Sequence, residues 1–494
     1  MKQRGVGAST RWLVVVVLVA LVAAACGGND DNGGGDAATP QAETTAPTAE
    51  AEPEPAPAEP EPDEPAQATA EEPAPTEGPA AVEAPEATTE PTPEPIVLTD
   101  SFRGVTSEAI LIGHVHVDFE RLRTDFGLDL PYGSFGPPFL ALVDWYNEQG
   151  GVLGRRLEAI SEAYWPVGSA GAEELCLKLT EDVEVFAVLG GFTGSGSAGV
   201  NTCITELHET ILVGGLPSRS EAEAAGGRWV IAPTSLDRRN AAFVSVLEQT
   251  GRIDELGPIM VIAITGAPPG LVDSVVELLE AAGAEVPVVA KAAYTGDTIA
   301  TQEEMDVFVE RGRVEGVEAI MLIGESPTRD AQLFANAPDM VYLVPNGDRI
   351  GTWEQEQPEG LSPDTVVLTA RTFLDYPVDD PRIQQCIEVV EAATGVQVVP
   401  PDQQAEGDPD YWPGMFNACR DLAIFVQIAE AAGPNLTNES WVEALGRVPD
   451  LSVPGYGFVS IRPGKIDAND QQYLMEYDYD SKTFVELAGP LDVG

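Results

Sequence analysis

A loop rich in glycine and hydroxyl groups is the first stretch of this sequence whose residue types could do chemistry. Residues 191–197 read Gly-Phe-Thr-Gly-Ser-Gly-Ser and continue directly from an apolar run that begins at Val185. Glycines let a backbone approach a ligand closely, and the hydroxyls of Thr193, Ser195 and Ser197 can donate hydrogen bonds to it. The other interpretation is an ordinary strand-to-helix turn with a serine cap. We take the loop as a candidate binding site for a small polar solute.

The sequence carries none of the common catalytic motifs, and its one spacing that suits a metal has another interpretation. It has no G-x-S-x-G, H-E-x-x-H or Walker pattern, and Ser197 has no histidine close to it. His114 and His116 lie two residues apart on a predicted buried strand, with Asp118 beyond, a spacing that could hold a metal. We interpret this pair as core residues, and His208 falls on a predicted helix that should point away from the loop. We therefore expect a binding protein, not an enzyme, with no metal and no cofactor.

Apolar runs alternate with helical stretches along most of the chain, and these elements must position the loop. Strands are predicted at 109–117, 157–164, 185–191, 211–215, 229–234, 258–265, 286–294, 319–325, 341–346 and 366–370. Helices are predicted at 135–149, 170–182, 196–208, 237–250, 269–283, 302–313, 328–336, 381–394 and 413–432, before a strand-rich tail that ends with 471–479. This alternation indicates an α/β fold whose parallel sheets are covered on both faces, in two lobes.

The position of the loop supports a binding role. In open α/β sheets, ligands bind beyond the carboxyl ends of the strands. Helix N-termini at that edge offer free N–H groups and a partial positive charge, which suit a carboxylate. Residues 191–197 follow a predicted strand and precede a predicted helix, so they lie at such an edge.

The N-terminal residues have the layout of a secretory signal. A positively charged head precedes the apolar run 13–22, three alanines and Cys26. The run is short for a membrane span, which needs about 20 residues. The cysteine after small residues resembles a bacterial lipobox, in which that cysteine is lipidated. We expect a signal peptide over 1–25 and a lipid anchor on Cys26, so that the protein lies on the outer face of the cell membrane.

Residues 26–95 are expected to form the lipidated cysteine and a disordered tether. From residue 27 onward they are mostly Gly, Asn and Asp, then Ala, Pro, Glu and Thr, with no Lys or Arg. Almost nothing apolar and larger than alanine is present, so no core can form. Proline and self-repelling charge should keep the segment extended. A spacer that holds a folded domain away from a membrane needs only such length and solubility.

Charge and cysteine content restrict the partners and the compartment. The net charge is −55, which argues against nucleic acid and other anionic partners. Four cysteines beyond Cys26 fit an exported protein, where disulfides persist, and they allow three pairings. We predict that sequence neighbours pair and that each pair ties two adjacent helices, which gives Cys176 with Cys203 and Cys386 with Cys419. No C-x-x-C occurs that would indicate a redox motif or a zinc site.

Several of these stretches resemble type I periplasmic binding proteins of the branched-chain amino acid receptor kind, the substrate-binding lipoproteins of ABC transporters. Residues 110–117 (ILIGHVHV) are similar to their first strand, and 141–160 (ALVDWYNEQGGVLGRRLEAI) to their first helix, double-glycine turn and second strand. Residues 176–199 resemble their next helix, strand and ligand loop, and 458–479 their closing segment. The resemblance covers essentially all of 108–490, and NEQGGVLGR is its most specific piece.

The resemblance implies two doubly wound parallel-sheet lobes joined by three crossings. The crossings are expected near Thr234, Thr369 and Asp470. Lobe 1 would then comprise 96–234 and 370–470, and lobe 2 would comprise 235–369 and 471–494. The family holds its ligand between the lobes, which close by a hinge motion, and we expect this chain to act as a monomer.

The resemblance also implies further site residues. Leu216 and Ser218 follow the next strand, where the family makes its second backbone and hydroxyl contact. Tyr132 resembles the aromatic residue that covers the ligand from the first loop, behind an apparent insertion over 118–130. The second lobe would add Tyr294 and Glu325, each just past a strand.

Asn346 completes the expected second-lobe set and marks a departure from the family. Amino-acid-binding members carry an acidic residue in the P-x-G turn that pairs with the ligand ammonium. This chain reads Pro345-Asn346-Gly347 there, although Glu325 or Asp348 could substitute. An amide, a short peptide or a carboxylic acid is therefore as plausible a ligand as an α-amino acid.

The expected function is that of an extracytoplasmic solute-binding protein of an ABC importer. It would capture a small-molecule solute, an amino acid, amide or carboxylate, and deliver it to an ABC permease complex. The alternative is a ligand-sensing receptor lipoprotein on the same fold that feeds a signalling partner. A lipoprotein hydrolase would need a nucleophile–base pair that the sequence does not offer.

Overall fold

The computed structural model describes most of the chain beyond residue 96. The described residues are 97–494 without 128–129, 195, 265–266, 268–269, 294–297, 325–326, 351–352, 354–356, 372–377, 401–402, 406–407 and 449–450. The predictions for the signal peptide, Cys26 and the tether concern residues outside these ranges and stay predictions. Among the helices of the described part, none combines the length and the apolar character that a membrane crossing needs.

The first sheet is wholly parallel and has the order β2-β1-β3-β4-β5. Its strands are β1 (Ala109–Val117), β2 (Arg156–Tyr164), β3 (Ala187–Gly190), β4 (Ile211–Gly214) and β5 (Trp229–Val230). In β3, Ala187 and Leu189 belong to one buried apolar cluster and Val188 to another. Successive side chains of a strand point to opposite faces, so both faces of this sheet are covered, as the continuous apolar runs predicted.

Helices from two distant parts of the chain cover this sheet. They are α3 (Gly136–Glu148), α4 (Ala170–Leu177), α5 (Arg219–Ala225), α11 (Pro381–Thr394), α12 (Trp412–Ala432) and α13 (Asn438–Ala444), while α2 (Phe119–Phe126) follows β1. Helices α11 and α12 contact α3, and α12 also contacts β3 and β4. One apolar cluster joins Phe139 of α3, Phe425 of α12 and Trp441 of α13. The first sheet therefore depends on residues some 300 positions apart in sequence for its core.

The second sheet has the order β12-β11-β10-β9-β8-β6-β7. Its strands are β6 (Ile259–Ile264), β7 (Val288–Ala292), β8 (Ala319–Ile323), β9 (Val341–Val344), β10 (Val367–Thr369), β11 (Gln471–Asp478) and β12 (Thr483–Asp492). Strands β6 to β10 are mutually parallel, whereas β11 pairs antiparallel with both β10 and β12. The strand-rich tail thus extends this sheet and does not continue the alternation.

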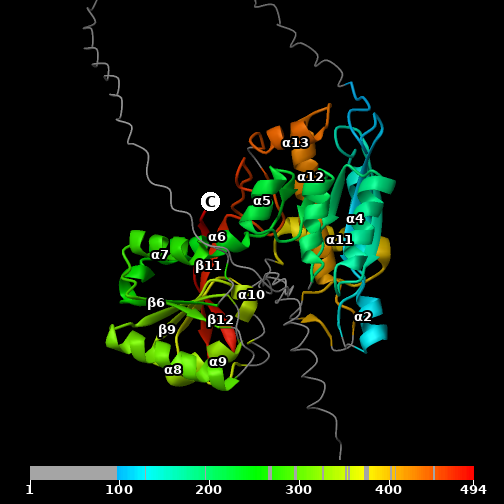
Figure 1. The fold of residues 1–494 in the computed structure, drawn as a ribbon. Helices are drawn as coiled ribbons and strands as arrows, with labels where there is room; N and C mark the ends of the chain where they lie inside the picture. Colours follow the sequence, from blue (N-terminus) through cyan, green and yellow to red (C-terminus); the bar gives the residue numbers. More distant parts are fainter. Residues whose placement is uncertain are drawn as a thin grey trace, which may run out of the picture. The chain divides into compact units, whose positions relative to one another are not determined.

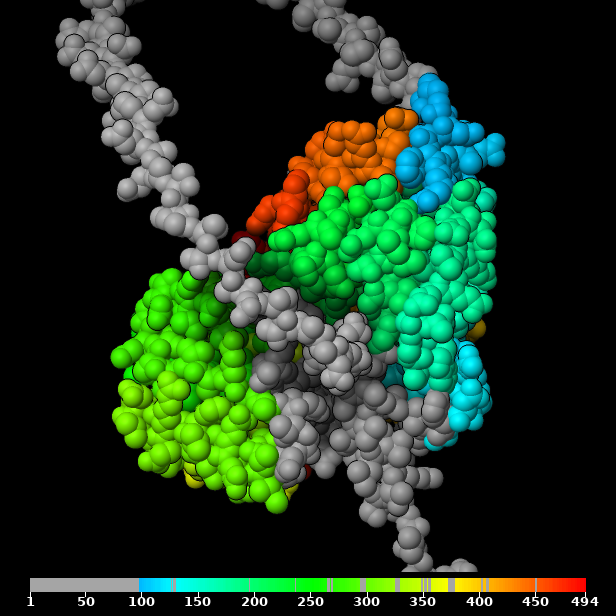
Figure 2. Space-filling model, in the orientation of Figure 1, coloured from blue at the N-terminus to red at the C-terminus, as the bar shows by residue number. Residues whose placement is uncertain are grey.

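The second sheet is also covered on both faces. Its helices are α6 (Leu236–Gln249), α7 (Leu271–Ala281), α8 (Thr298–Val314), α9 (Pro327–Asn336) and α10 (Gly347–Ile350). Figure 1 shows α6 and α7 on one side of the strands and α8 and α9 on the other, and Figure 2 shows the green and yellow-green surfaces that they make. In β6, Met260 packs with the α8–α9 cluster and Val261 with the α6–α7 cluster. The predicted α/β fold with two doubly wound sheets is therefore confirmed.

Two stretches of chain that connect strands of the first sheet with elements of the second run side by side. Residues 231–232, which follow β5, pair in parallel with 466–469, which precede β11. Ile231 N donates to Ile466 O at 2.9 Å, and Asn469 N donates to Ala232 O at 3.1 Å. Thr234 and Asp470, where crossings are expected, lie just after these two stretches, and Thr369 is the last residue of β10. The division into lobes at these positions stays a prediction.

A buried group of charges holds the two stretches together. Arg238 of α6 contacts Asp467 (Nη1–Oδ1, 2.6 Å) and Asp470 (Nη2–Oδ1, 3.0 Å). Lys465 Nζ lies 3.0 Å from Asp470 Oδ1 and 3.4 Å from Asp467 Oδ1. Asp467 Oδ2 also accepts from the backbone N–H of Ser235 at 2.7 Å. Two cations and two carboxylates thus neutralise one another where water is largely excluded.

The most specific stretch of the sequence resemblance has a structural role. In NEQGGVLGR, Gly151 has φ of +63°, and a Cβ there would lie 1.9 Å from Arg155 O, so only glycine fits. The Arg155 side chain is fully buried and donates to three carbonyls, those of Thr106 (2.6 Å), Thr99 (2.9 Å) and Pro434 (2.8 Å). This arginine fastens the segment before β1 and the α12–α13 connection to the start of β2.

The helix predicted over 196–208 is replaced by a 3₁₀ turn, η3 (Ala198–Val200), and a π-helical turn, η4 (Cys203–Leu207). The reason is side-chain competition with the backbone. Asn201 accepts from Phe192 N and donates to Ala198 O, while Thr202 and Thr205 donate to carbonyls three and four residues back. The sequence pattern also did not predict helices α2, α5 and α13 or strand β12.

Both disulfides have the predicted pairing of sequence neighbours. Cys176 at the end of α4 joins Cys203 at the start of η4, with the Cα atoms 6.4 Å apart. Cys386 of α11 joins Cys419 of α12, with the Cα atoms 6.1 Å apart. The second bridge ties two α-helices, as expected, whereas the first ties an α-helix to a π-helical turn.

Candidate ligand-binding site

Each sheet has one point where the strand order reverses direction, and ligands of such folds bind at the carboxyl ends of the strands beside it. In the first sheet this point lies between β1 and β3, and in the second between β6 and β8. The loop 191–197 follows β3, and Glu325 follows β8 within residues that the structure does not describe. The topology therefore places the glycine–hydroxyl loop at the edge where binding is expected.

Tyr164, at the end of β2, fixes the first half of this loop. Its Oη accepts from Thr193 N at 2.6 Å and donates to Thr193 O at 3.0 Å, with Thr193 Oγ1 3.2 Å away. Burial raises the pKa of Tyr164, so its hydroxyl stays protonated. The Thr193 side chain remains exposed beyond this contact. The loop is thus preordered with a hydroxyl group at its surface.

Asn201 and Ser197 hold the second half of the loop. Asn201 Oδ1 accepts from Phe192 N at 2.7 Å, and Asn201 Nδ2 donates to Phe192 O at 2.8 Å. Ser197 is fully buried, and its hydroxyl donates to Gly168 O at 2.6 Å. Its predicted role as a ligand donor stays a prediction, and in this structure its hydroxyl is used within the protein. Ser195 lies outside the described residues.

Leu216 and Ser218 follow β4, directly beside the end of β3. Gly215 N donates to Gly190 O at 2.8 Å, so the two loops begin together. The Leu216 side chain is 44% exposed. Ser218 caps α5, since its hydroxyl lies 2.8 Å from Glu221 Oε2 and accepts from Glu221 N. The structure therefore brings Thr193 and Leu216 to one edge as exposed groups, whereas the Ser218 hydroxyl serves the helix cap.

Tyr132 lies on a loop that the inserted helix α2 supports. Arg123 of α2 donates to Tyr132 O at 2.7 Å, and the rings of Phe119 and Tyr132 are 4.9 Å apart. Tyr132 pairs with Asp410, and burial together with that carboxylate raises its pKa. The ring of Tyr411 packs so closely on Gly133 that a Cβ there would meet it at 2.3 Å. Tyr411 therefore packs against the loop that carries Tyr132.

The corresponding edge of the second sheet carries cationic side chains. Asn346 Oδ1, just after β9, accepts from Arg239 Nη1 at 3.0 Å. Arg329, buried after β8, donates to Gly324 O at 2.9 Å and pairs with Asp330 at 3.0 Å. Arg371, after β10, lies 4.3 Å from the ring of Tyr473. Tyr294 and Glu325 lie outside the described residues.

His114 and His116 occupy the core of the first sheet. The His114 ring stacks on Phe139 with centroids 4.0 Å apart, and its Nδ1 lies 2.8 Å from Ser161 Oγ. His116 Nδ1 lies 3.3 Å from Val117 O. Burial lowers the pKa of both rings, and that of His114 falls well below its usual range. The side chains serve packing, in agreement with the interpretation as core residues.

This burial predicts acid sensitivity. The unfolded chain binds a proton at His114 below about pH 6.5 while the folded protein does not, so stability should fall as the pH drops. We expect the free energy of unfolding to decrease by at most about 1.4 kcal/mol per pH unit from this group between pH 6.5 and 5. Urea unfolding of His114→Gln should show a shallower decrease than that of the unmodified protein. An unchanged pH dependence in His114→Gln would contradict this assignment.

The predicted residues thus fall into separate groups. Thr193, Ser197, Leu216 and Ser218 lie on the two neighbouring loops after β3 and β4, and Tyr132 lies on the loop between α2 and α3. Asn346 belongs to the edge of the second sheet. Sequence reasoning missed the groups that fix these loops, namely Tyr164, Asn201, Arg123 and Arg239. A tyrosine at the end of a strand and an asparagine inside a predicted helix give no pattern that would single them out.

Comparisons with known proteins find solved structures with a similar fold but no match by sequence. No protein-family model and no curated protein matches this chain. An ABC transporter substrate-binding protein from Desulfitobacterium hafniense is 16% identical, with a TM-score of 0.52 over 77% of this chain and 100% of that one. A protein named as a branched-chain amino acid ABC transporter from Rhodospirillum rubrum is 15% identical, with a TM-score of 0.53 over 77% and 100%.

A third solved structure adds a bound ligand. The solute-binding protein of an ABC transporter from R. palustris, in complex with 4-hydroxybenzoate, is 15% identical, with a TM-score of 0.50 over 78% of this chain and 96% of that one. Identities this low establish the fold alone. The two α/β sheets of this chain therefore have the type I periplasmic binding protein fold, as the sequence resemblance predicted.

Proposed function

We propose that this protein is an extracytoplasmic solute-binding protein of an ABC importer, which holds a small polar solute between two lobes and acts by binding, not by catalysis. The observation that carries the proposal is the preordered loop after β3. It presents the Thr193 hydroxyl at the point where the strand order of the first sheet reverses. The fold shared with ABC substrate-binding proteins over about three quarters of the chain supports it.

The second-sheet edge supports a particular class of solute. An α-amino acid needs an anionic or acceptor group for its ammonium, and the turn after β9 offers Asn346 with Arg239 beside it. A guanidinium at this position disfavours an ammonium and favours a ligand oxygen. We propose a carboxylate or amide without an α-ammonium group as the preferred solute, with Tyr132, Thr193 and Leu216 contacting it from the first lobe. Tyr294, Glu325 and Ser195 stay candidates from the sequence.

The remaining expectations belong to the same proposal. The chain would be a monomer, anchored through a lipid on Cys26 to the outer face of the membrane and held off it by residues 27–95. Its macromolecular partner would be an ABC permease complex. No observation in the described part of the chain supports the alternative, a sensing receptor on the same fold.

A matched set of ligands tests the proposal. Leucine, 4-methylpentanoate and 4-methylpentanamide share one carbon skeleton and differ in their ammonium and carboxyl groups, and 4-hydroxybenzoate extends the set. At 100 times its dissociation constant, a ligand of the folded state adds about 2.7 kcal/mol to stability, which a thermal-shift assay detects. We expect the ligands without an ammonium group to raise the melting temperature most. Asn346→Asp should move the preference toward leucine.

Two outcomes would count against different parts of the proposal. If leucine alone stabilises the protein, solute binding stands and the inference from Asn346 and Arg239 is wrong. If no member of this set or of a wider panel of amino acids, amides and carboxylates changes the melting temperature, the binding function itself loses its basis. Thr193→Val is the companion variant, since it removes the exposed hydroxyl and keeps the size of the side chain.

A further inference from the structure

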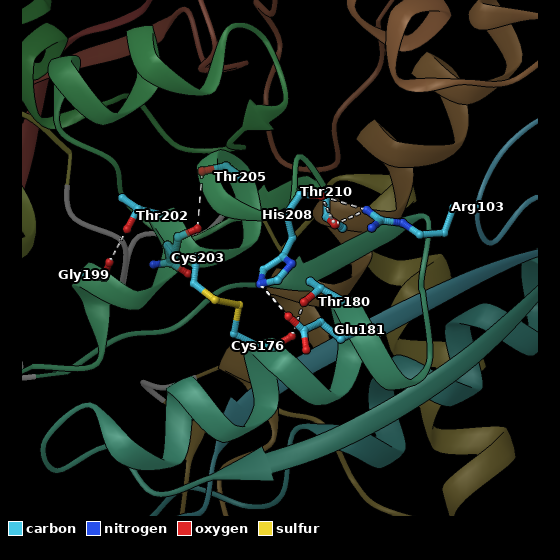
Figure 3. Close-up of a disulfide and its surroundings, with 11 residues drawn as sticks. Arg103, Cys176, Thr180, Glu181, Gly199, Thr202, Cys203, Thr205, His208 and Thr210 are labelled. Carbon is cyan, nitrogen blue, oxygen red and sulfur yellow. Dashed lines mark hydrogen bonds and ion pairs between the residues drawn. A yellow bond between two sulfur atoms is a disulfide. The ribbon is translucent and has the colours of Figure 1, made fainter.

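The disulfide between Cys176 and Cys203 has two polar side chains beside it. Figure 3 shows the His208 ring and the Glu181 carboxylate pointing toward each other next to the two sulfur atoms. The ligand atoms of Cys176, Cys203 and His208 all lie within 4.8 Å of one another. His208 Nε2 is 3.8 Å from Glu181 Oε1. Cysteine sulfur, imidazole nitrogen and carboxylate oxygen are all ligands that zinc takes in proteins.

Two π-helical turns create this arrangement. Cys203 opens η4 and is followed five positions later by His208, and Cys176 lies five positions before Glu181 on the turn η2 (Lys178–Asp182). In an α-helix, residues five apart lie about 140° apart around the axis, on nearly opposite sides. The wider π turn brings such residues back toward one side, because its hydrogen bonds join residues five apart. His208 thereby lies next to both sulfurs, and Glu181 faces His208.

The two turns end in the same way. In η2, Val183 N donates to Lys178 O at 2.9 Å and Val185 N to Leu179 O at 3.0 Å. In η4, His208 N donates to Cys203 O at 3.1 Å and Thr210 N to Ile204 O at 2.8 Å. Single π turns are rare and occur frequently at functional sites. Here two such turns with matching ends flank one disulfide. An S–S bond alone does not require them.

Arg103 fixes the histidine end of the site. Its Nη2 donates to His208 O at 3.0 Å and to Thr210 Oγ1 at 2.6 Å (Figure 3). The His208 side chain is 18% exposed and that of Glu181 is 59% exposed, while Cys176 is fully buried. An ion from solvent can therefore reach the histidine and carboxylate directly. The backbone that would carry the ligands is already anchored.

We propose that the Cys176–Cys203 pair forms a zinc site when its disulfide is reduced. A dithiol reductant supplies two electrons and two protons. The S–S bond breaks to give two thiols, and the reductant closes to a cyclic disulfide. Zn²⁺ then binds both sulfurs and displaces their two protons, while a ring nitrogen of His208 and the carboxylate of Glu181 complete a tetrahedral set. An external disulfide reverses the exchange: it takes two electrons from the two thiolates and two protons from solvent to become a dithiol, the S–S bond re-forms, and the ion is released.

The distances suit this exchange. Zinc–sulfur bonds of about 2.3 Å and zinc–nitrogen bonds of about 2.0 Å place tetrahedral ligand atoms roughly 3.5–3.8 Å apart. The sulfurs must therefore separate from bonding distance, and the histidine nitrogen, which lies within 4.8 Å of both sulfurs, must approach them by at most roughly 1.3 Å. The Cα atoms of the cysteines are 6.4 Å apart, which rotation about the side-chain bonds can accommodate. Such movements need no rearrangement of α4 or of the first sheet.

The other disulfide provides an internal control. Cys386 and Cys419 also join two neighbouring segments, but in the described part of the chain the only group of three metal-ligating side chains includes Cys176, Cys203 and His208. Reduction of both disulfides should thus create one zinc site and one pair of free thiols.

Cobalt provides a spectroscopic test. The full chain is reduced with a phosphine, which leaves no competing thiol, and titrated with Co²⁺ and then with Zn²⁺. We expect thiolate-to-cobalt charge transfer and the intense visible bands of tetrahedral Co²⁺, at one ion per chain, and release of about two protons per ion. The oxidised chain should show neither. Cys386→Ser with Cys419→Ser should retain the bands, whereas Cys176→Ser with Cys203→Ser should lose them.

Variants of the other two ligands separate this site from zinc bound by thiols alone. His208→Ala should weaken zinc binding at least tenfold, and Glu181→Gln should weaken it less, since water can replace the carboxylate. Bands that persist in Cys176→Ser with Cys203→Ser, or an affinity that His208→Ala leaves unchanged, would overturn the proposal. Circular dichroism and the melting temperature check the fold. A reduced chain that zinc does not stabilise would equally overturn it.

Discussion

Arg155→Met should lower the free energy of unfolding by about 3–5 kcal/mol, one of the two largest effects that we expect from a single substitution. The Arg155 side chain is fully buried and donates to the carbonyls of Thr99, Thr106 and Pro434. A hydrogen bond from a charged donor contributes about 1.5–3 kcal/mol, and a buried carbonyl without a partner adds a desolvation cost. Methionine fills much of the volume but satisfies none of the three oxygens.

The neighbouring residue offers a matched control for this prediction. Arg156 is exposed on β2, so Arg156→Met should change stability by no more than about 0.5 kcal/mol. Arg155→Lys keeps one charge and should fall between the two. Urea midpoints of the three variants and the unmodified protein decide the matter. Equal midpoints for Arg155→Met and Arg156→Met would show that the buried guanidinium contributes little to holding these segments together.

Asp467→Asn should destabilise the protein by about 3–5 kcal/mol, the usual cost of breaking a buried ion pair from one side. Asp467 is 1% exposed and receives Arg238 and the N–H of Ser235, with Lys465 nearby. After substitution, two cations share Asp470 alone. The effect should appear in the stretch that joins the two sheets, so the variant should also change how strongly a bound ligand stabilises the protein.

The pH dependence gives this prediction an independent check. Burial alone would raise the pKa of Asp467, but Arg238 and Lys465 outweigh it and hold the pKa below its usual value. The group therefore contributes stability above about pH 4, and this contribution is lost as the pH falls through the folded-state pKa. The difference between Asp467→Asn and the unmodified protein should shrink below pH 4. Asp480→Asn, at an exposed turn, is the control. A difference that stays constant down to pH 2 would contradict the role of the charge.

The sequence predicted the strands far better than it predicted the site. Continuous apolar runs leave little choice for buried parallel strands, and the predicted 109–117 coincides with β1. The helix predicted over 196–208 is wrong because Asn201, Thr202 and Thr205 bond to nearby backbone groups. The spacing of apolar residues does not reveal such bonds. Helix α2 lies between the Asp118 cap and Gly127, and Phe119, Leu122 and Phe126 recur at helical spacing, but eight mostly polar residues are too short a stretch for this pattern to stand out.

The places of the site residues could be predicted from the sequence, but their hydrogen-bond partners could not. Position after a strand is fixed by topology, so Thr193, Leu216 and Asn346 could be placed at strand ends. Which group a hydroxyl or amide bonds depends on partners far away in sequence, as with Ser197 and Gly168 or Asn346 and Arg239. A local sequence pattern does not identify partners that lie far apart in the chain. Tyr164 was read as the end of a strand, and its bonds to Thr193 became visible only in three dimensions.

The late return of the chain to both sheets sets the order in which the protein can fold as it is made. The core over the first sheet takes residues from α11 to α13, and the second sheet receives β11 and β12 from 471–492. Strand β10 therefore keeps an open edge, and the first sheet a bare apolar face, until nearly all of the chain has emerged. Neither half can close early, so an interrupted synthesis would leave both exposed and prone to aggregation.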